Sequence, residues 1–338
     1  MNEKLPKSNN TGKTSKIRLV YLLAASHSGS TLLAMLLNSH PDVCTVGELK
    51  ATSFGNPDKY RCSCQQLIKE CPFWNGIRQD MAERGFDFDI TNAGTDIRTD
   101  MSSYVHRLLK PLHRSPAIES VRDMALHLSP VWRKKLPEII ARNLALIQCV
   151  AARTEKNIIV DSSKVGIRLK YLLRIPELEI RVIRAIRDGR GVALTYIDPA
   201  SFADASDPVL RQGGMGGNRS GERLTMEQAA REWQRSNEEA EQALKLIDPS
   251  QQTISHYEDL CSNPEETLNR LFTFIGVDPK KRNQDFRMVE HHIIGNGMRL
   301  DSSNTIKLDE RWRSNLSPSD LKIFHSIAGN MLRKLGYK

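Results

Sequence analysis

The sequence predicts an α/β fold in which a central parallel sheet is flanked by helices. Three apolar runs of strand length, at 17–25, 156–161 and 179–186, are each followed by a polar or small-residue loop and then by a helical segment. Because such motifs bracket most of the chain, we expect one domain over residues 17–338. Residues from about 51 to 155 lack this rhythm, and we expect a largely helical insertion there.

The first strand, Ile17–Ala25, runs into a turn of small and polar residues, Ser26–Thr31, and then into the apolar helical segment 32–40. Strand, turn and helix in this order point free backbone N–H groups and a helix N-terminus at an anion. The sequence therefore predicts a P-loop-like phosphate-binding turn. A nucleoside-triphosphate P-loop has Gly and Lys where this chain has Ala24 and Ser30. Losing that Lys disfavours ATP or GTP hydrolysis and favours a donor that needs no metal.

The insertion contains helical patterns separated by prolines, and we expect it to form a helical cap over the donor site. The expected helices are 64–84, 101–114, 121–128 and 136–155, with Pro116, Pro130 and Pro137 as breaks. After the insertion the alternation of strands and helices resumes. We expect helices at 166–174, 191–196 and 225–247, a strand at 252–257, and two further helices that begin after Asn263-Pro264 and Ser317-Pro318.

Three blocks of the sequence carry a resemblance to a known family. They are Ser28–Leu32 in the turn, Arg187–Thr195 after the strand 179–186, and the segment 257–276, which includes Tyr257-Glu258-Asp259-Leu260 and Phe274-Ile275-Gly276. In this order they resemble the sulfotransferases that use 3′-phosphoadenosine 5′-phosphosulfate (PAPS) as co-substrate. The resemblance covers about 17–48 and 157–336 and is weak through 51–153.

The resemblance implies which residues bind the donor. The turn would hold the 5′-phosphosulfate. Arg187 and Thr195, which keep the eight-residue spacing of the family, would hold the 3′-phosphate, and a C-terminal loop would close over the nucleotide. The implied PAPS-binding residues are Ser28, Gly29, Ser30, Thr31, Leu32, Arg187, Thr195 and Arg299. We expect no metal requirement and no metal ligands in this site.

Catalysis of sulfuryl transfer requires a base for the acceptor and positive charge for the leaving phosphate. By the resemblance, Glu48 in Gly47-Glu48 is the candidate base, and Asp161 and His106 are weaker candidates. The family usually carries Lys or Arg directly before the Ser-Gly pair, whereas this chain carries His27. Either His27 itself, Lys164 at the end of a predicted strand, or the amides of the turn would then stabilise the leaving group.

Two other functions stay open from the sequence. A P-loop kinase or nucleotide hydrolase is the closest rival, although the missing Lys argues against it. A non-catalytic nucleotide-binding protein is the other, because His27 departs from the family pattern. We expect a small-molecule, glycan or peptide acceptor, and the sequence does not indicate which one or what the oligomeric state is.

The composition limits partners and location. The net charge is +9, but only 6% of residues are aromatic and no basic-aromatic block of the RNA-binding kind occurs, so we expect no nucleic acid partner. No apolar stretch reaches the ~20 residues of a membrane span. Arg18 interrupts the apolar run that would otherwise imitate a signal peptide. We therefore expect a disordered tail at 1–16 and a cytoplasmic protein.

Three of the six cysteines, Cys62, Cys64 and Cys71, cluster in the insertion. Plain structural thiols, a disulfide or metal staple, and a redox switch are all compatible with this spacing, which is not a standard zinc pattern and lacks a fourth ligand. His291 and His292 suggest metal less strongly, because neighbouring side chains point apart on regular structure.

Overall fold

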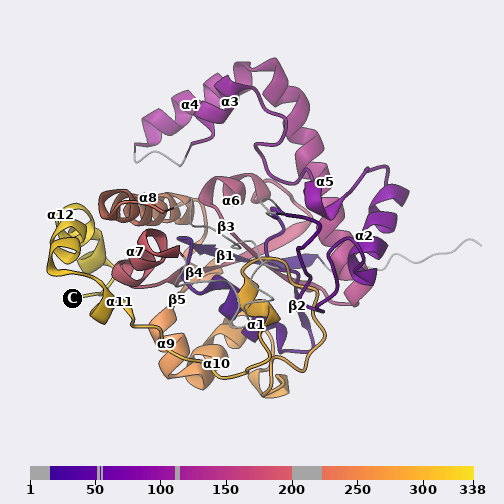
Figure 1. Ribbon diagram of the computed structural model, residues 1–338. Coiled ribbons are helices and arrows are strands. Elements are labelled where there is room, and N and C mark those ends of the chain that lie inside the picture. The colour runs from indigo at the N-terminus through magenta and orange to yellow at the C-terminus, as the bar shows by residue number, and fades with distance from the viewer. Residues whose placement is uncertain (1–15, 52–53, 55, 111–114, 200–222) are drawn as a thin grey trace, which may run out of the picture.

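The computed structural model describes residues 16–338 apart from 52–53, 55, 111–114 and 200–222. The predicted tail, except Lys16, thus lies outside the described residues. Among those described, five parallel strands form one sheet in the order β2-β3-β1-β4-β5, which confirms the predicted fold class (Figure 1). Their bounds are β1 Ile17–Ala24, β2 Val43–Thr45, β3 Ile158–Lys164, β4 Leu178–Ile186 and β5 Gln252–His256.

The sheet is apolar on both faces because helices cover both. In β1, Leu19, Tyr21 and Leu23 face one core cluster, whereas Val20 and Leu22 face the other. This explains why β1 reads as a continuous apolar run. In Figure 1, α1 (Ser30–Asn38), α9 (Tyr257–Ser262) and α10 (Pro264–Ile275) lie below the sheet, and α5 (Pro130–Thr154), α6 (Gly166–Leu172) and α8 (Met226–Leu244) lie above it.

A third core cluster lies beyond the sheet at its carboxyl end. There Trp233 of α8 packs on Phe324, with 5.7 Å between ring centroids. The helices that share this cluster are α7 (Gly189–Ile197), α8, α11 (Trp312–Asn315) and α12 (Pro318–Lys334). Because α7 and α11 follow segments that line the candidate site, this cluster fixes one wall of that site.

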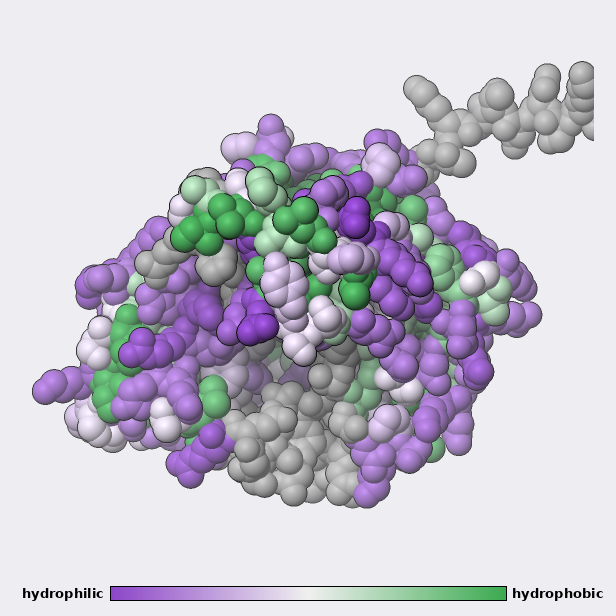
Figure 2. Space-filling view, turned by 90° about the horizontal axis from the view of Figure 1, so that it is seen from above, coloured by the Kyte–Doolittle hydropathy of each residue, from purple (hydrophilic) through white to green (hydrophobic). Residues whose placement is uncertain are grey.

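The insertion contains α2 (Pro72–Glu83), which lies beside α5 at the side of the sheet, and α3 (Ser103–Leu108), α4 (Pro116–Leu128) and α5, which rise into an arch above the sheet (Figure 1). One face of α4 exposes apolar side chains, and Figure 2 shows apolar residues gathered on the upper surface of the molecule; those of α4 are Ile118, Val121, Met124 and Leu128. The role of the insertion as a cap remains a prediction.

Pro116 and Pro130 act as the breaks that we expected, because each is the first residue of a helix, whereas Pro137 does not. Pro130 is the first residue of α5, after Ser129, whose side chain accepts a hydrogen bond from the backbone N–H of Trp132. Pro137 lies inside the same helix. The physical reason is that a proline in the first turn removes no intrahelical hydrogen bond, and the long apolar face of α5 stabilises the helix through Pro137.

Outside the insertion the strand and helix bounds agree with the prediction to within a few residues. Within it, the helix expected at 64–84 begins only at Pro72, and the one expected at 101–114, of which 111–114 lie outside the described residues, is Ser103–Leu108. The capping box of Thr225 and Gln228 at the start of α8 is confirmed. The strand β2 was not predicted from the sequence. It has only three residues, and so short a strand shows no hydrophobic periodicity. No described helix combines the length and the apolar character that crossing a membrane requires.

Candidate active site

The carboxyl ends of the strands bring the predicted site residues to one edge of the sheet. Glu48 follows β2, Lys164 ends β3, the turn 25–29 follows β1, Arg187 follows β4 and Tyr257 follows β5. Because the sheet order is β2-β3-β1-β4-β5, these groups stand in the order Glu48, Lys164, turn, Arg187, Tyr257 along that edge. Ligands of open α/β sheets bind at this edge.

The turn has the backbone geometry of an anion-binding loop. Gly29 is the N-cap of α1 with φ +79°, and a Cβ there would lie 2.5 Å from the ring of Tyr257. His27 also has positive φ, at 62°. Within the described part of the chain, the buried hydroxyl of Ser28 has no hydrogen-bond partner. The turn therefore offers the amides at the start of α1 and a spare hydroxyl to an anion.

Arg187 is in direct contact with the turn. Its Nη1 donates a hydrogen bond to the backbone carbonyl of His27 at 2.9 Å, and its guanidinium lies 4.4 Å above the centroid of the Tyr257 ring. Its Nη2 pairs with Asp309 at 3.0 Å. Although burial alone would raise the pKa of Asp309, the hydrogen bond from Arg311 and the charge of Arg187 lower it to about 2. A carboxylate thus neutralises part of the charge of Arg187.

Thr195 lies eight residues after Arg187, about two helical turns further along the chain. Its hydroxyl donates to the carbonyl of Gly191 at 3.1 Å, and a Cβ at Gly191 would lie 3.4 Å from Nε of Arg187. A pocket of about 310 Å³ opens beside Arg187 and Gly191, and Arg190 and Trp312 are also among its lining. Gly191 of α7 thus contacts both residues that the family resemblance assigns to the 3′-phosphate.

Glu48 and Lys164 form an ion pair at the other end of the row. Lys164 Nζ contacts Glu48 Oε1, and both side chains are largely buried. Lys164 has φ +71°, a conformation that costs energy outside glycine and that recurs at functional sites. A Cβ at Gly295 would lie 3.8 Å from the hydroxyl of Thr31 and 3.9 Å from Glu48 Oε1. The pair and the start of α1 therefore border the same small space.

Asp161 holds the Glu48 segment in place. It is fully buried, accepts the backbone N–H groups of Leu49 at 3.2 Å and Ser163 at 2.9 Å, and pairs with Arg168 at 3.2 Å. These contacts use the carboxylate oxygens, so Asp161 is explained as a structural residue rather than as a base. His106 lies in α3, far along the chain from these strand ends.

Comparison with known proteins finds similarity to sulfotransferases. No family model matches this sequence. Carbohydrate sulfotransferase 5 of Mus musculus is 22% identical over 335 residues, which span 94% of this chain and 80% of the relative. Carbohydrate sulfotransferase 6 of Homo sapiens is 21% identical over 339 residues, with the same coverage. Over most of its length the chain is thus similar to carbohydrate sulfotransferases.

Two solved structures are also similar to this chain. A sulfotransferase from Mycobacterium avium aligns with 96% of this chain and 78% of its own, at 10% identity and a TM-score of 0.48. The sulfotransferase domain from the curacin biosynthetic pathway aligns with 95% of this chain and 98% of its own, at 14% identity and a TM-score of 0.46.

His27 occupies the position where the family resemblance leads us to expect a cation. Its imidazole packs edge-on against the ring of Tyr196 on α7, with 4.8 Å between ring centroids. The side chain is half-buried and leans toward the Arg187 side of the turn. The ammonium of Lys164 lies on the other side, so the role of His27 at the leaving group remains a prediction.

Arg299 is buried among backbone carbonyls. It is 1% exposed, and its three guanidinium nitrogens donate to the carbonyls of Ile293, Gly295 and Arg61. The guanidinium also lies 4.7 Å from the ring centroid of Tyr60. These contacts hold two loops of the chain together, and binding of the 3′-phosphate by Arg299 remains a prediction.

Lys50 and Tyr257 are site residues whose roles the sequence did not reveal. Burial lowers the pKa of Lys50, whereas the charge of Glu48 raises it, so this lysine stands next to the Glu48–Lys164 pair. Its position two residues after Glu48 could have indicated it. The ring of Tyr257 packs against both Gly29 and Arg187. Only its tertiary contacts reveal that function, because the sequence shows Tyr257 merely as part of a family landmark.

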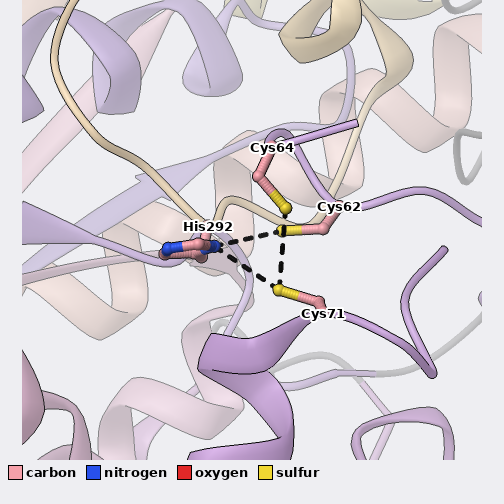
Figure 3. Close-up of side chains that lie close together, drawn as sticks. All are labelled: Cys62, Cys64, Cys71 and His292. Atoms are coloured by element: carbon pink, nitrogen blue, oxygen red, sulfur yellow. Dashed lines mark hydrogen bonds between the residues drawn. The ribbon is translucent and has the colours of Figure 1, made fainter. Parts of the chain in front are cut away.

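The cysteines of the insertion lie together at a separate place. Cys62, Cys64 and Cys71 converge on His292, as Figure 3 shows. A hydrogen bond from Cys62 lowers the pKa of Cys71 to about 4, against the effect of burial. These residues could hold a metal ion, but none of them belongs to the row of strand ends that forms the candidate active site.

Proposed function

We propose that this chain transfers the sulfuryl group of PAPS to a hydroxyl group of a carbohydrate acceptor. The observation that carries the proposal is the 2.9 Å hydrogen bond from Arg187 to the carbonyl of His27. It makes the segment expected at the 3′-phosphate a direct neighbour of the turn expected at the 5′-phosphosulfate. One adenine nucleotide can therefore reach both.

The order of the strand ends gives the donor a direction. With the 3′-phosphate at Arg187 and the 5′-phosphate on the amides of Gly29 and Ser30, the sulfuryl group points toward Lys164 and Glu48. Neighbouring strands lie about 4.8 Å apart, so this path from β4 over β1 to β3 and β2 has the length of a nucleotide. The acceptor then approaches from the Glu48 side.

The transfer step follows from this placement. The acceptor oxygen attacks the sulfur in line, the bond between sulfur and the bridging oxygen breaks, and adenosine 3′,5′-bisphosphate leaves with the electron pair. Glu48 takes the proton of the acceptor hydroxyl. The ammonium of Lys164 and the amides at the start of α1 stabilise the charge that grows on the sulfuryl and bridging oxygens. No metal takes part in this step.

The proposed acceptor class rests on the two curated relatives, both of which are carbohydrate sulfotransferases by name. The proton of a sugar hydroxyl is only weakly acidic, so a base such as Glu48 is needed to remove it during the attack on sulfur. The names of these relatives do not indicate the size of the sugar, so the acceptor screen includes mono- and oligosaccharides.

The test is a transfer assay with radiolabelled PAPS and a panel of carbohydrate acceptors. We expect labelled carbohydrate and adenosine 3′,5′-bisphosphate in equal amounts, with no requirement for magnesium. Magnesium-dependent consumption of ATP without transfer would instead identify a kinase or nucleotide hydrolase. Tight binding of adenosine 3′,5′-bisphosphate without transfer to any acceptor, including phenols and amines, would identify a non-catalytic nucleotide-binding protein.

A further inference from the structure

Three cysteines and one histidine from distant parts of the chain meet in one place. Cys62 and Cys64 lie in the loop before α2, Cys71 is the N-cap of α2, and His292 lies in the C-terminal segment, 221 residues after Cys71. Their four potential ligand atoms all lie within 4.8 Å of one another. Figure 3 shows the three sulfurs and the His292 ring pointing toward a common centre.

Three of the six distances between these atoms match the edges of a tetrahedral metal site. Cys64 Sγ lies 3.7 Å from Cys71 Sγ, and His292 Nδ1 lies 3.4 Å from Cys71 Sγ and 3.8 Å from Cys62 Sγ. Zinc bonds of about 2.3 Å to sulfur and about 2.0 Å to nitrogen give tetrahedral edges of about 3.8 Å between sulfurs and about 3.5 Å between sulfur and nitrogen. The other three distances are at most 4.8 Å, so small side-chain movements would bring all four atoms around one zinc ion.

The surroundings of His292 orient it as a metal ligand. Its Nε2 lies 3.2 Å from a carboxylate oxygen of Glu290, and its ring is stacked on Phe73 with 4.5 Å between centroids and 5° between planes. A proton shared with Glu290 on Nε2 leaves the lone pair of Nδ1 free for a metal, which is the usual outer arrangement of zinc-bound histidines. Backbone N–H groups of Gln66 and Trp74 donate to Cys64 and Cys71.

The neighbouring histidine faces another way. His291 Nδ1 lies 2.7 Å from the hydroxyl of Ser63, whose oxygen also accepts the backbone N–H of Ile293. The two adjacent imidazoles therefore point apart, as the sequence led us to expect. His292 faces the cysteines, whereas His291 faces Ser63. His291 provides a matched control, because it shares the location and residue type of His292 without facing the cysteines.

We propose that Cys62, Cys64, Cys71 and His292 bind one zinc ion. Three thiolates and an imidazole in tetrahedral geometry favour zinc over magnesium, calcium and manganese, which prefer oxygen ligands. All four positions are taken by protein atoms, so the site is closed and its role is structural rather than catalytic. The expectation that sulfuryl transfer needs no metal is unaffected.

The proposed zinc ion connects the insertion to a wall of the active site. His292 is followed by Ile293 and Ile294, and the backbone N–H of Ile294 donates to the carbonyl of Val46 at 2.9 Å. Gly295, next in the chain, borders both Thr31 and Glu48. A metal that fixes His292 therefore holds this segment against the Glu48 loop.

The test measures zinc per chain by mass spectrometry after dialysis of the full-length protein. We expect one zinc ion in the wild type, in Cys261→Ser, which removes a buried thiol elsewhere, and in His291→Gln. We expect its loss in Cys71→Ser and at least a several-fold weaker retention in His292→Ala. Wild-type protein with less than a tenth of an equivalent of zinc, or Cys71→Ser that keeps a full equivalent, would overturn the proposal.

Cobalt substitution tests the same site in the wild-type protein, so the result does not depend on whether a variant folds. Wild-type protein produced with cobalt in place of zinc should show a thiolate-to-cobalt charge-transfer band and the intense visible bands of tetrahedral cobalt. Their absence, together with six free thiols after denaturation, would show plain structural thiols. Four free thiols would show a disulfide in the cluster. Each of these results contradicts a zinc site and is independent of sulfuryl transfer.

Discussion

Among single residues, the ion pair of Glu48 and Lys164 is central to the proposed chemistry. It sits where β2 and β3 end, it is largely buried, and Asp161 braces the backbone on which Glu48 stands. The carboxylate of Glu48 can accept the proton of the acceptor, while the ammonium of Lys164 faces the growing negative charge of the donor. The two residues thus have separate roles in one step.

Glu48→Gln should lower kcat by about 10²- to 10⁴-fold, because the amide cannot take the acceptor proton. The affinity for adenosine 3′,5′-bisphosphate should stay close to that of the wild type. Steady-state transfer assays and calorimetry measure the two quantities. Glu241→Gln is the matched control, because Glu241 is also a partly buried carboxylate in ion pairs, with Arg184 and Lys334. Unchanged turnover in Glu48→Gln would exclude the base role.

Asp309 is expected to compete with the nucleotide for Arg187. Its carboxylate occupies one side of the guanidinium in the absence of a ligand. Asp309→Asn should therefore bind adenosine 3′,5′-bisphosphate several-fold more tightly, because the 3′-phosphate no longer displaces an anion. Calorimetry measures this affinity, and a weaker or equal affinity would show that Asp309 supports the bound state instead.

The same variant should be less stable without nucleotide at pH 7. The pKa of Asp309 is lowered to about 2, so its ion pairs stabilise the folded state above the unfolded pKa of about 3.9. That contribution is lost as the pH falls from about 4 toward 2. We expect a loss of about 1–2 kcal/mol in the free energy of unfolding at pH 7, after allowance for solvent screening. The difference between variant and wild type should shrink in urea unfolding at pH 3.

At the scale of elements, close contacts between loops shape the site as much as the strands do. Gly47 has φ +86°, and a Cβ there would lie 1.8 Å from the carbonyl oxygen of Ile294. That contact places the segment from His292 to Gly295 against the Glu48 loop. A similar close contact occurs at the start of α1, where the missing side chain of Gly29 leaves room for the ring of Tyr257.

Gly47→Ala should be much more destabilising than Gly85→Ala. Gly85 shares the positive φ, at +81°, but a Cβ there would meet nothing within 4 Å. We expect Gly85→Ala to lose about 1–2 kcal/mol for backbone strain, and Gly47→Ala to lose at least about 2 kcal/mol more because a backbone carbonyl must move. Urea unfolding measures both. Equal losses would mean that the close approach of Ile294 contributes little.

For the whole molecule, the sequence predicts the sheet and most of the site because both depend on local patterns. An apolar run marks a buried strand, and the residues after it must lie at the carboxyl edge, so the Gly29 turn, Lys164 and Arg187 could be placed before their neighbours were known. β2 escaped detection because three residues show no period. Pro137 was expected to interrupt a helix, but it lies inside α5, because tertiary packing overrides a local helix breaker.

Residues whose function depends on distant partners were harder to predict. The family resemblance assigns Arg299 to the 3′-phosphate, but the sequence gives no sign of the three carbonyls that accept hydrogen bonds from its guanidinium. The cysteine cluster lacked a fourth ligand because His292 lies 221 residues from Cys71 in the chain. Contacts over such separations are set by the fold, so spacing in the sequence cannot reveal them.

The most direct test of the central claim compares two nucleotides on two proteins by calorimetry. Adenosine 3′,5′-bisphosphate and AMP share the 5′-phosphate, and only the former carries the 3′-phosphate expected at Arg187. Arg187→Ala should weaken the binding of the bisphosphate by about 10- to 100-fold, which corresponds to the loss of a charge-assisted hydrogen bond. It should weaken the binding of AMP by far less. Arg190→Ala, which removes a neighbouring arginine stacked on Trp312, is the control. Equal losses for both nucleotides in Arg187→Ala would contradict the claim that one donor spans the turn and Arg187.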